Sequence, residues 1–219
     1  MTSQLPCAHP NPCQMNKLSD RNDYELPAEY DFTGKAPVRG RFHSPKKNSI
    51  TKPPDIRPAR AADAETVARI YVDSWNASFG ELLSRSDRTL GPELVARWRR
   101  ALSRSVPHRW WVAERCGAIV GFAGIGPSRD PVDPSIGELD TLAVDEPHWR
   151  TGVGSALIAD AHHHLAADGY RTAILWTVAG YRQGIAFYEA MGWRRDGGVR
   201  DRGRQIRFRR DPIAAHRPG

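Results

Sequence analysis

The segment from Gly137 to Leu157, GELDTLAVDEPHWRTGVGSAL, constrains the fold more than any other part of the chain. Residues 138–144 combine β-forming and apolar side chains, which favours a strand. The sequence Asp145-Glu146-Pro147 breaks that strand, and from Ser155 onward apolar residues recur at helical spacing. The segment therefore predicts a strand, a tight loop over residues 149–154 and a long helix.

Two glycines, Gly152 and Gly154, stand where this loop enters the helix. Glycine lets the backbone come close to a ligand, and the first-turn amides of a helix have no partners inside the helix. Because the helix dipole adds positive potential at this point, the site suits an anion such as a pyrophosphate. The alternative is an ordinary helix start with two turn glycines.

The spacing of these glycines argues against two common nucleotide-binding motifs. A dinucleotide fingerprint needs a third glycine where this chain has Leu157, and a Walker loop needs a Gly-Lys-Ser/Thr that is missing here. The pattern that remains is Q/R/W-x-x-G-x-G/A after a strand, filled here by residues 149–154, WRTGVG. On these residues the chain resembles the GCN5-related N-acetyltransferase (GNAT) superfamily, whose pyrophosphate loop has this form.

The rest of the chain predicts further elements on both sides of this unit. On the N-terminal side we expect a strand at 56–59, a helix capped by Asp63, a helix at about 92–103, and a hairpin of strands 109–114 and 118–124. On the C-terminal side we expect a buried strand at 170–178, a helix at 182–191, and strands at 193–195 and 205–209. Because the fourth and fifth strands are joined through a helix, they should be parallel. The predicted fold is α/β (α+β), with a mixed, mostly antiparallel seven-stranded sheet flanked by about four helices.

Three more motifs extend the resemblance over residues 55–211. The first helix carries IYVDSW at 70–75, the hairpin carries Ala113-Glu114 followed by Val120-Gly121-Phe122, and FYEAMGW stands at 187–193. All three are similar to segments of small bacterial GNAT acetyltransferases and occur in the same order. The resemblance implies the GNAT fold, with the fourth and fifth strands splayed around acetyl-CoA. It also implies transfer of the acetyl group to a primary amine, of a small molecule or of a peptide or protein, by direct attack.

The resemblance also assigns the cofactor-binding residues. The pantetheine arm should pair with the exposed backbone of the fourth strand, and the pyrophosphate should lie on the loop amides; these residues are Leu142, Ala143, Val144, Arg150, Thr151, Gly152, Val153, Gly154 and Ser155. The alternative for the Arg150 side chain is a plain surface position. Two residues depart from the family pattern: Tyr181 stands where many members carry an asparagine that steadies the cofactor arm, and Gly184 replaces a common alanine.

Three candidate catalytic residues follow from their places in these motifs. Tyr188 matches the family tyrosine whose hydroxyl protonates the departing thiolate; a phenol is protonated at neutral pH, and the alternative is a core tyrosine. Glu138 and Asp140 lie two residues apart and therefore on one face of the fourth strand. Either carboxylate is a candidate base or substrate anchor, and deprotonation of the amine in bulk water is a third route.

Aromatic residues are the candidates for the acceptor pocket: Trp75, Phe79 and Trp176, with core packing as the alternative. A metal site at His162-His163-His164 is not expected, because consecutive helical residues point about 100° apart. We interpret the three histidines as a solvated helix face. The expected chemistry needs acetyl-CoA as cosubstrate and no metal.

The flanking segments differ from the central domain. Residues 1–54 hold eight of the seventeen prolines and show no periodicity, so we expect a disordered N-terminal extension, and residues 212–219 should form a C-terminal tail. Cys7, His9 and Cys13 lack a fourth ligand at zinc-finger spacing.

Charge, cysteine content and hydropathy bear on partners and location. Three cysteines give no even disulfide framework, and neither a membrane span nor a secretory signal is apparent, so we expect a cytoplasmic protein. The net charge is +7, with one dense arginine run at 200–210 that we interpret as a solvated or substrate-edge strand rather than a nucleic-acid patch. A homodimer is an expectation from the resemblance alone. Two other functions stay open: a non-catalytic acyl-CoA-binding sensor, and association with nucleic acid.

Overall fold

A computed structural model describes residues 52–83, 88–104, 106–129, 133 and 135–211, and the structural statements below concern these residues. All of them belong to one compact unit, Thr51–Gly219, of the two into which the chain divides. The expected N-terminal extension, apart from residues 52–54, lies outside the described residues. So do the expected C-terminal tail and the residues Cys7, His9 and Cys13.

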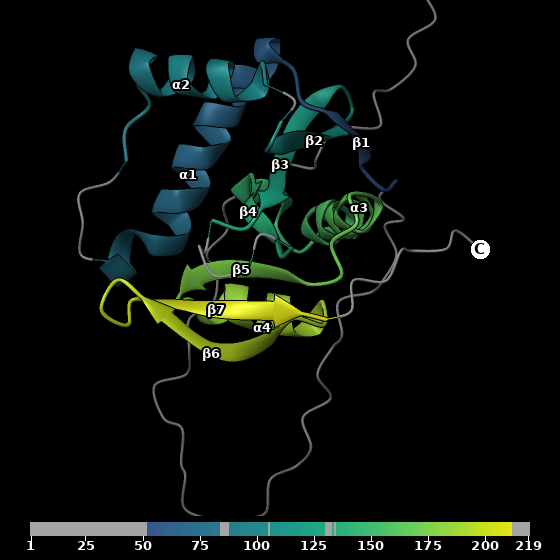
Figure 1. The fold of residues 1–219 in the computed structure, drawn as a ribbon. Coiled ribbons are helices and arrows are strands. Elements are labelled where there is room, and N and C mark those ends of the chain that lie inside the picture. Colours follow the sequence, from purple (N-terminus) through teal and green to yellow (C-terminus); the bar gives the residue numbers. More distant parts are fainter. Residues whose placement is uncertain (1–51, 84–87, 105, 130–132, 134, 212–219) are drawn as a thin grey trace, which may run out of the picture. The chain divides into compact units, whose positions relative to one another are not determined.

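Seven strands form a single mixed sheet in the order β1-β2-β3-β4-β5-β7-β6 (Figure 1). They are β1 (Asp55–Pro58), β2 (Arg109–Arg115), β3 (Ala118–Pro127), β4 (Gly137–Val144), β5 (Ala173–Val178), β6 (Arg194–Arg200) and β7 (Gln205–Arg210). The β4–β5 pair is parallel and the other pairs are antiparallel. The predicted mixed, mostly antiparallel seven-stranded sheet is therefore confirmed.

Four α-helices accompany the sheet: α1 (Ala64–Leu83), α2 (Pro92–Leu102), α3 (Val153–Ala167) and α4 (Arg182–Ala190). Helix α3 connects the two parallel strands, as predicted. Its C-terminus explains why β5 begins at Ala173 rather than at Tyr170. Gly169 adopts a left-handed φ of 89°, and the Tyr170 amide donates to the Leu165 carbonyl at 3.1 Å, so this stretch closes the helix before the strand begins.

The two faces of the sheet carry separate hydrophobic cores. Successive residues of a strand point to opposite faces. On β2, Trp111 and Ala113 pack into the core that contains the apolar face of α3, while Val112 packs into the core formed with α1 and α2. Helices α1 and α2 therefore cover one face, and α3 covers the other together with Ile185 of α4 (Figure 1).

One expectation about individual side chains needs correction. The histidine triplet does not form a solvated face: His163 is exposed, but His162 is only 8% exposed, because it lies one turn after the core residue Ile158 and packs near Trp193.

Candidate active site

A cleft opens in the sheet where β4 and β5 separate. The parallel pair is formed only at Gly137–Ala173 and Glu138–Ile174, whereas β4 continues to pair with β3 as far as Val144. The edge of β4 that faces β5 therefore lacks a strand partner over residues 142–144. The cleft has a volume of about 1390 Å³ and is lined by both separated strands together with α1, α3 and α4. An unpaired strand edge of this kind binds extended ligands through its main chain.

The loop of residues 149–154, called the glycine loop below, closes one end of the cleft. Gly152 is the N-cap of α3 with a left-handed φ of 88°, and no side chain caps the helix. Arg150, Gly152, Gly154 and Ser155 line the cleft. The first-turn amides of α3 are thus offered to a ligand, as an anion site requires. A side chain at Gly154 would narrow this site, because a Cβ there would lie 3.2 Å from the Phe187 ring.

Other residues fix the loop from behind. Arg115 donates to the Thr151 hydroxyl at 2.9 Å and to the Thr151 carbonyl at 2.7 Å, so the Thr151 side chain is held outside the residues that line the cleft. Val153 is fully buried in the core under α3. Thr151 and Val153 are both predicted to bind the pyrophosphate. Their side chains support the loop, so only their main-chain groups can contact a ligand.

These features fit acetyl-CoA. The unpartnered helix amides suit its pyrophosphate, and the free edge of β4 suits its extended, amide-containing arm. The residues that would hold it are Leu142, Ala143, Val144, Arg150, Gly152, Gly154, Ser155 and Tyr181, which all line the cleft.

Tyr188 of α4 reaches the same cleft. Its side chain is partly buried and packs near Phe187 and Phe208. Burial raises the pKa of the Tyr188 hydroxyl well above its usual range, and the neighbouring Tyr181 adds to the shift. The phenol is therefore protonated at every physiological pH, the state required to donate a proton or a hydrogen bond.

The two predicted carboxylates have different environments. Asp140 lines the cleft and forms an ion pair with Arg129. Glu138 is 4% exposed, does not line the cleft, and accepts a hydrogen bond from the Arg129 main-chain amide at 2.8 Å. Asp140 also lies at a bulge, because the β3 partner shifts between Leu139 and Thr141. The same arginine therefore contacts both groups, but Asp140 alone of the two faces the ligand space.

The predicted acceptor residues Trp75, Phe79 and Trp176 all line the cleft. Trp75 and Phe79 pack edge to face with ring centroids 4.8 Å apart, and the Arg88 guanidinium lies 3.7 Å from the Trp75 ring centroid. The Arg200 guanidinium lies 4.3 Å from the ring centroid of Trp176 on β5. The three aromatic side chains thus border the cleft rather than a closed core.

Several lining residues are absent from the sequence-based prediction: Tyr71, Arg97, Trp98, Trp110, Arg129 and Arg200. Tyr71 had a local signal, since it lies one helical turn before Trp75. The arginines had none, because α2, the end of β3 and β6 are brought to the cleft only by the tertiary fold.

The arginine run of the C-terminal hairpin is engaged within the domain. Arg207 pairs with Asp196 at 2.8 Å, and Arg210 donates to the Met191 carbonyl. Together with the stacking of Arg200 on Trp176, these contacts distribute the run over different parts of the fold. They favour the interpretation of a solvated or substrate-edge strand over that of one continuous basic patch.

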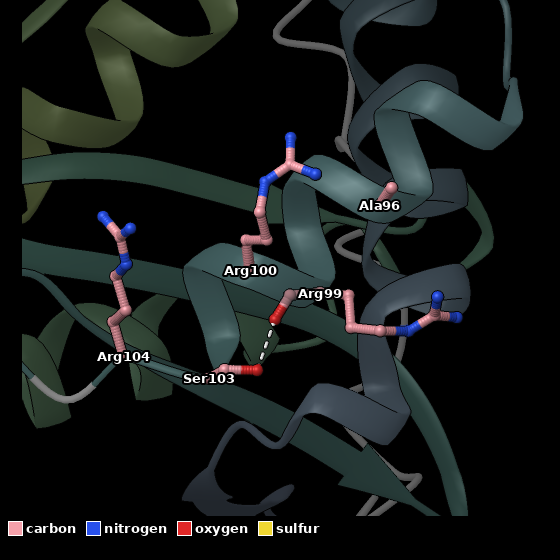
Figure 2. Close-up of a pocket in the computed structure, with 5 residues that line it drawn as sticks. All are labelled: Ala96, Arg99, Arg100, Ser103 and Arg104. Atoms are coloured by element: carbon pink, nitrogen blue, oxygen red, sulfur yellow. Dashed lines mark hydrogen bonds between the residues drawn. The ribbon is translucent and has the colours of Figure 1, made fainter.

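A second, smaller hollow of about 440 Å³ lies on α2 (Figure 2). Its lining residues are Ala96, Arg99, Arg100, Ser103 and Arg104. The Ser103 hydroxyl donates to the Arg99 carbonyl at 2.7 Å, and the three guanidinium groups point in different directions. This hollow offers cations but no carboxylate or phenol, so the cleft between β4 and β5 is the candidate active site.

In the described part of the chain, no group of three or more His, Cys, Asp and Glu side chains is arranged to hold a metal ion. None of its helices combines the length and the apolar character that crossing a membrane requires.

Solved structures share this fold. PaiA N-acetyltransferase from Thermoplasma acidophilum, in complex with coenzyme A, superposes with a TM-score of 0.57 at 16% identity, over 72% of this chain and 98% of that chain. YncA from Salmonella typhimurium, solved with its cofactor acetyl-CoA, gives a TM-score of 0.58 at 20% identity, over 76% and 97% of the two chains.

Sequence comparisons agree. The uncharacterized N-acetyltransferase YuaI of Bacillus subtilis (strain 168) is 28% identical over 137 residues, 62% of this chain and 77% of that protein. The phosphinothricin N-acetyltransferase of Streptomyces viridochromogenes is 27% identical over 157 residues, 69% of this chain and 80% of that protein. The model of the acetyltransferase (GNAT) family matches residues 65–193. This chain therefore belongs to the acetyltransferase (GNAT) family and is an acetyl-CoA-dependent N-acetyltransferase.

Proposed function

We propose that the cleft transfers the acetyl group of acetyl-CoA directly to a primary amine, with Tyr188 as the general acid. The amine nitrogen forms a bond to the acetyl carbon, the carbon–sulfur bond breaks, and the leaving thiolate takes the Tyr188 proton. The observation that carries this proposal is the position of Tyr188, which lines the cleft between β4 and β5 and whose hydroxyl has a pKa raised by burial.

Asp140 is the residue that we assign to the amine. Its carboxylate faces the cleft and can hold an ammonium group or accept the proton that the attacking nitrogen loses. Glu138 has a different role in this proposal, because its oxygen binds the Arg129 amide and its side chain does not line the cleft. Glu138 fixes the chain segment at Arg129, and Arg129 is the ionic partner of Asp140.

The charges of the cleft support an acceptor that carries an anionic group besides its amine. Arg97, Arg129 and Arg200 are lining residues outside the expected cosubstrate site, and Asp140 is the acidic residue among the lining residues. A purely cationic amine would meet a net positive wall, whereas an amine with a carboxylate or a similar anion would be attracted. The likeness to a phosphinothricin N-acetyltransferase makes phosphinothricin the first acceptor to test.

The test uses the full-length protein with acetyl-CoA and a panel of amines with and without an anionic group, and it follows release of the free thiol. We expect turnover, and we expect Tyr188→Phe to lower kcat by about 10² to 10³ with an unchanged Kd for acetyl-CoA. Tyr170→Phe is the matched control, because Tyr170 does not line the cleft.

Two results would contradict the proposal. Full activity of Tyr188→Phe would show that Tyr188 is not the general acid. Tight acetyl-CoA binding without transfer to any amine of the panel would point instead to a non-catalytic acyl-CoA sensor.

A further inference from the structure

Helix α2 and the turn after it carry a cluster of exposed arginines, which we call the α2 arginine face: Arg97, Arg99, Arg100 and Arg104. Within the part of the chain that the structure describes, their guanidinium groups form no ion pair and no hydrogen bond. Trp98 and Leu102 bury the other side of the helix in the core shared with α1. The arginines are thereby fixed on the side of α2 that faces solvent.

The α2 arginine face is continuous with the cleft. Arg97 lines the cleft, outside the expected cosubstrate site. Arg100 follows three residues later, and residues at this spacing are neighbours on one side of a helix. Arg100 and Arg104 in turn line one hollow (Figure 2). Exposed cations therefore continue from the cleft over roughly 10 Å along the helix axis.

Ring contacts connect this end of α2 to a predicted acceptor residue. The Trp98 ring packs edge to face on Tyr71, with centroids 5.4 Å apart, and Tyr71 lies 6.1 Å from Trp75. All three side chains line the cleft. A substrate whose amine lies beside Trp75 can therefore extend out of the cleft over α2.

The stability of the helix does not account for these charges. Arg99 and Arg100 stand in the last turn of α2, where cations complement the helix dipole. Arg97 precedes that turn, and Arg104 follows the helix. Like charges three or four residues apart repel each other, and Glu93 is the one acidic residue of α2. An anionic partner would remove this repulsion.

The arrangement fits several anions spaced along a chain. The guanidinium groups of Arg99, Arg100 and Arg104 point in different directions, so they do not converge on one small anion (Figure 2). The carboxylates of successive acidic residues can pair with them one at a time, in the bidentate geometry that guanidinium favours. A polypeptide also supplies the primary amine that the proposed function requires, at its N-terminus or on lysine, whereas a nucleic acid carries no aliphatic amine.

We propose that the α2 arginine face is a docking surface for an acidic polypeptide acceptor. The acceptor amine enters the cleft, and acidic side chains close to it in sequence pair with Arg97, Arg100 and Arg104. This inference rests on the proposed function, since it specifies the anionic acceptor of the same cleft.

The test compares two peptide amides as acceptors for the full-length protein, with release of the free thiol as the readout. The peptides are Ala-Lys-Glu-Glu-Glu-Ala and Ala-Lys-Gln-Gln-Gln-Ala, which offer the same two amines and differ only in charge. We expect KM for the Glu peptide to be about fivefold to tenfold lower, as two or three exposed ion pairs provide. The difference should shrink as the salt concentration rises.

A double substitution outside the cleft assigns this preference to α2. Arg100→Gln combined with Arg104→Gln should raise KM for the Glu peptide about threefold to fivefold. Its kcat, its KM for the Gln peptide and its Kd for acetyl-CoA should stay as in the wild type. The matched control is Arg171→Gln combined with Arg194→Gln, which changes the net charge equally. Both of these side chains are exposed and line neither the cleft nor the hollow, so this variant should behave as the wild type does.

The outcomes separate this inference from the proposed function. Equal KM values for the two peptides would overturn the inference, and acetylation of small anionic amines would then leave the proposed function intact. An equal rise of KM in the Arg171 and Arg194 control would also overturn it, because net charge alone would then explain the preference. Binding of oligo(dT) that the α2 substitutions abolish, without a preference between the peptides, would make the face a nucleic-acid site instead. If no amine of either kind is acetylated, the proposed function fails, and the acceptor role of the peptide fails with it.

Discussion

The Trp149 indole Nε1 donates a hydrogen bond to the Val144 carbonyl at 2.7 Å. This bond folds the start of the glycine loop back onto the end of β4. The strand edge that suits the pantetheine arm and the helix start that suits the pyrophosphate are thus held in one arrangement. Trp149 itself also lines the cleft.

Replacing Trp149 with Phe should loosen this arrangement. The ring is largely kept, but the donor is lost and the Val144 carbonyl loses its indole partner, which costs about 1–3 kcal/mol when such a group stays buried. We expect the Kd of acetyl-CoA, measured by calorimetry, to rise about tenfold. Trp176→Phe is the control, because Trp176 is a predicted acceptor residue that lines the cleft and should change the KM of the amine instead. An unchanged Kd for Trp149→Phe would show that the loop holds its form without this bond.

Local sequence patterns predicted the parts of the site that are built locally. The glycines at 152 and 154 and the apolar periodicity after them were enough to predict a loop that opens α3, because turn conformation and helix initiation depend on neighbours in sequence. The separation of β4 from β5 came from the family resemblance alone. Strand pairing depends on residues far apart in sequence, and no pattern inside either strand reports it.

The remaining features depend on the tertiary fold. The ion pair between Arg129 and Asp140 joins the end of β3 to a bulge in β4, and the bulge gives no signal in the sequence. In the sequence, Tyr181 and Gly184 are two separate departures from the family pattern. The structure relates them, because the Tyr181 ring fills the space that a Cβ on residue 184 would occupy. The prediction of a solvated helix face is wrong for His162. Three consecutive polar residues give no sign in the sequence that one of them is buried.

The pH dependence of the reaction should reflect the burial of Tyr188. Because burial raises the pKa of its hydroxyl, the acid form persists above the ordinary tyrosine pKa of about 10. We expect kcat of the wild type to show no alkaline decline up to about pH 10. A pH–rate profile at saturating acetyl-CoA and amine measures this, and a decline centred near pH 8 would exclude Tyr188 as the group that must stay protonated.

The two carboxylates should respond differently to neutralisation. Asp140→Asn removes the acidic group that lines the cleft and leaves Arg129 without its ionic partner, so we expect kcat/KM for the amine to fall about tenfold to a hundredfold. Glu138→Gln keeps an oxygen that accepts from the Arg129 amide, and its effect should stay within about threefold. Steady-state kinetics with varied amine measure both variants, with the Kd of acetyl-CoA as the unaffected reference. A larger loss for Glu138→Gln would reverse the assignment.

His162 should make the fold sensitive to mild acid. Burial, with a smaller contribution from Arg210, lowers its pKa from 6.5 to about 4 in the folded protein. Above pH 6.5 both the folded and the unfolded chain hold it neutral, and it has no effect. Between pH 6.5 and about 4, His162 is protonated in the unfolded chain but stays neutral in the folded chain. The free energy of unfolding therefore falls as the pH falls. The loss reaches about 3 kcal/mol near pH 4, as the lowering of the pKa from 6.5 to about 4 implies.

Denaturant unfolding of the wild type and of His162→Leu across this pH range isolates the contribution, because the other histidines are common to both proteins. We expect the variant to lose less stability than the wild type between pH 6.5 and 4. His163→Leu is the matched control. The His163 side chain is exposed, so its removal should leave the pH dependence of the wild type intact. Equal acid slopes for wild type and His162→Leu would mean that His162 is protonated without opening the core, and the burial of its imidazole beside Trp193 would then carry no cost in acid.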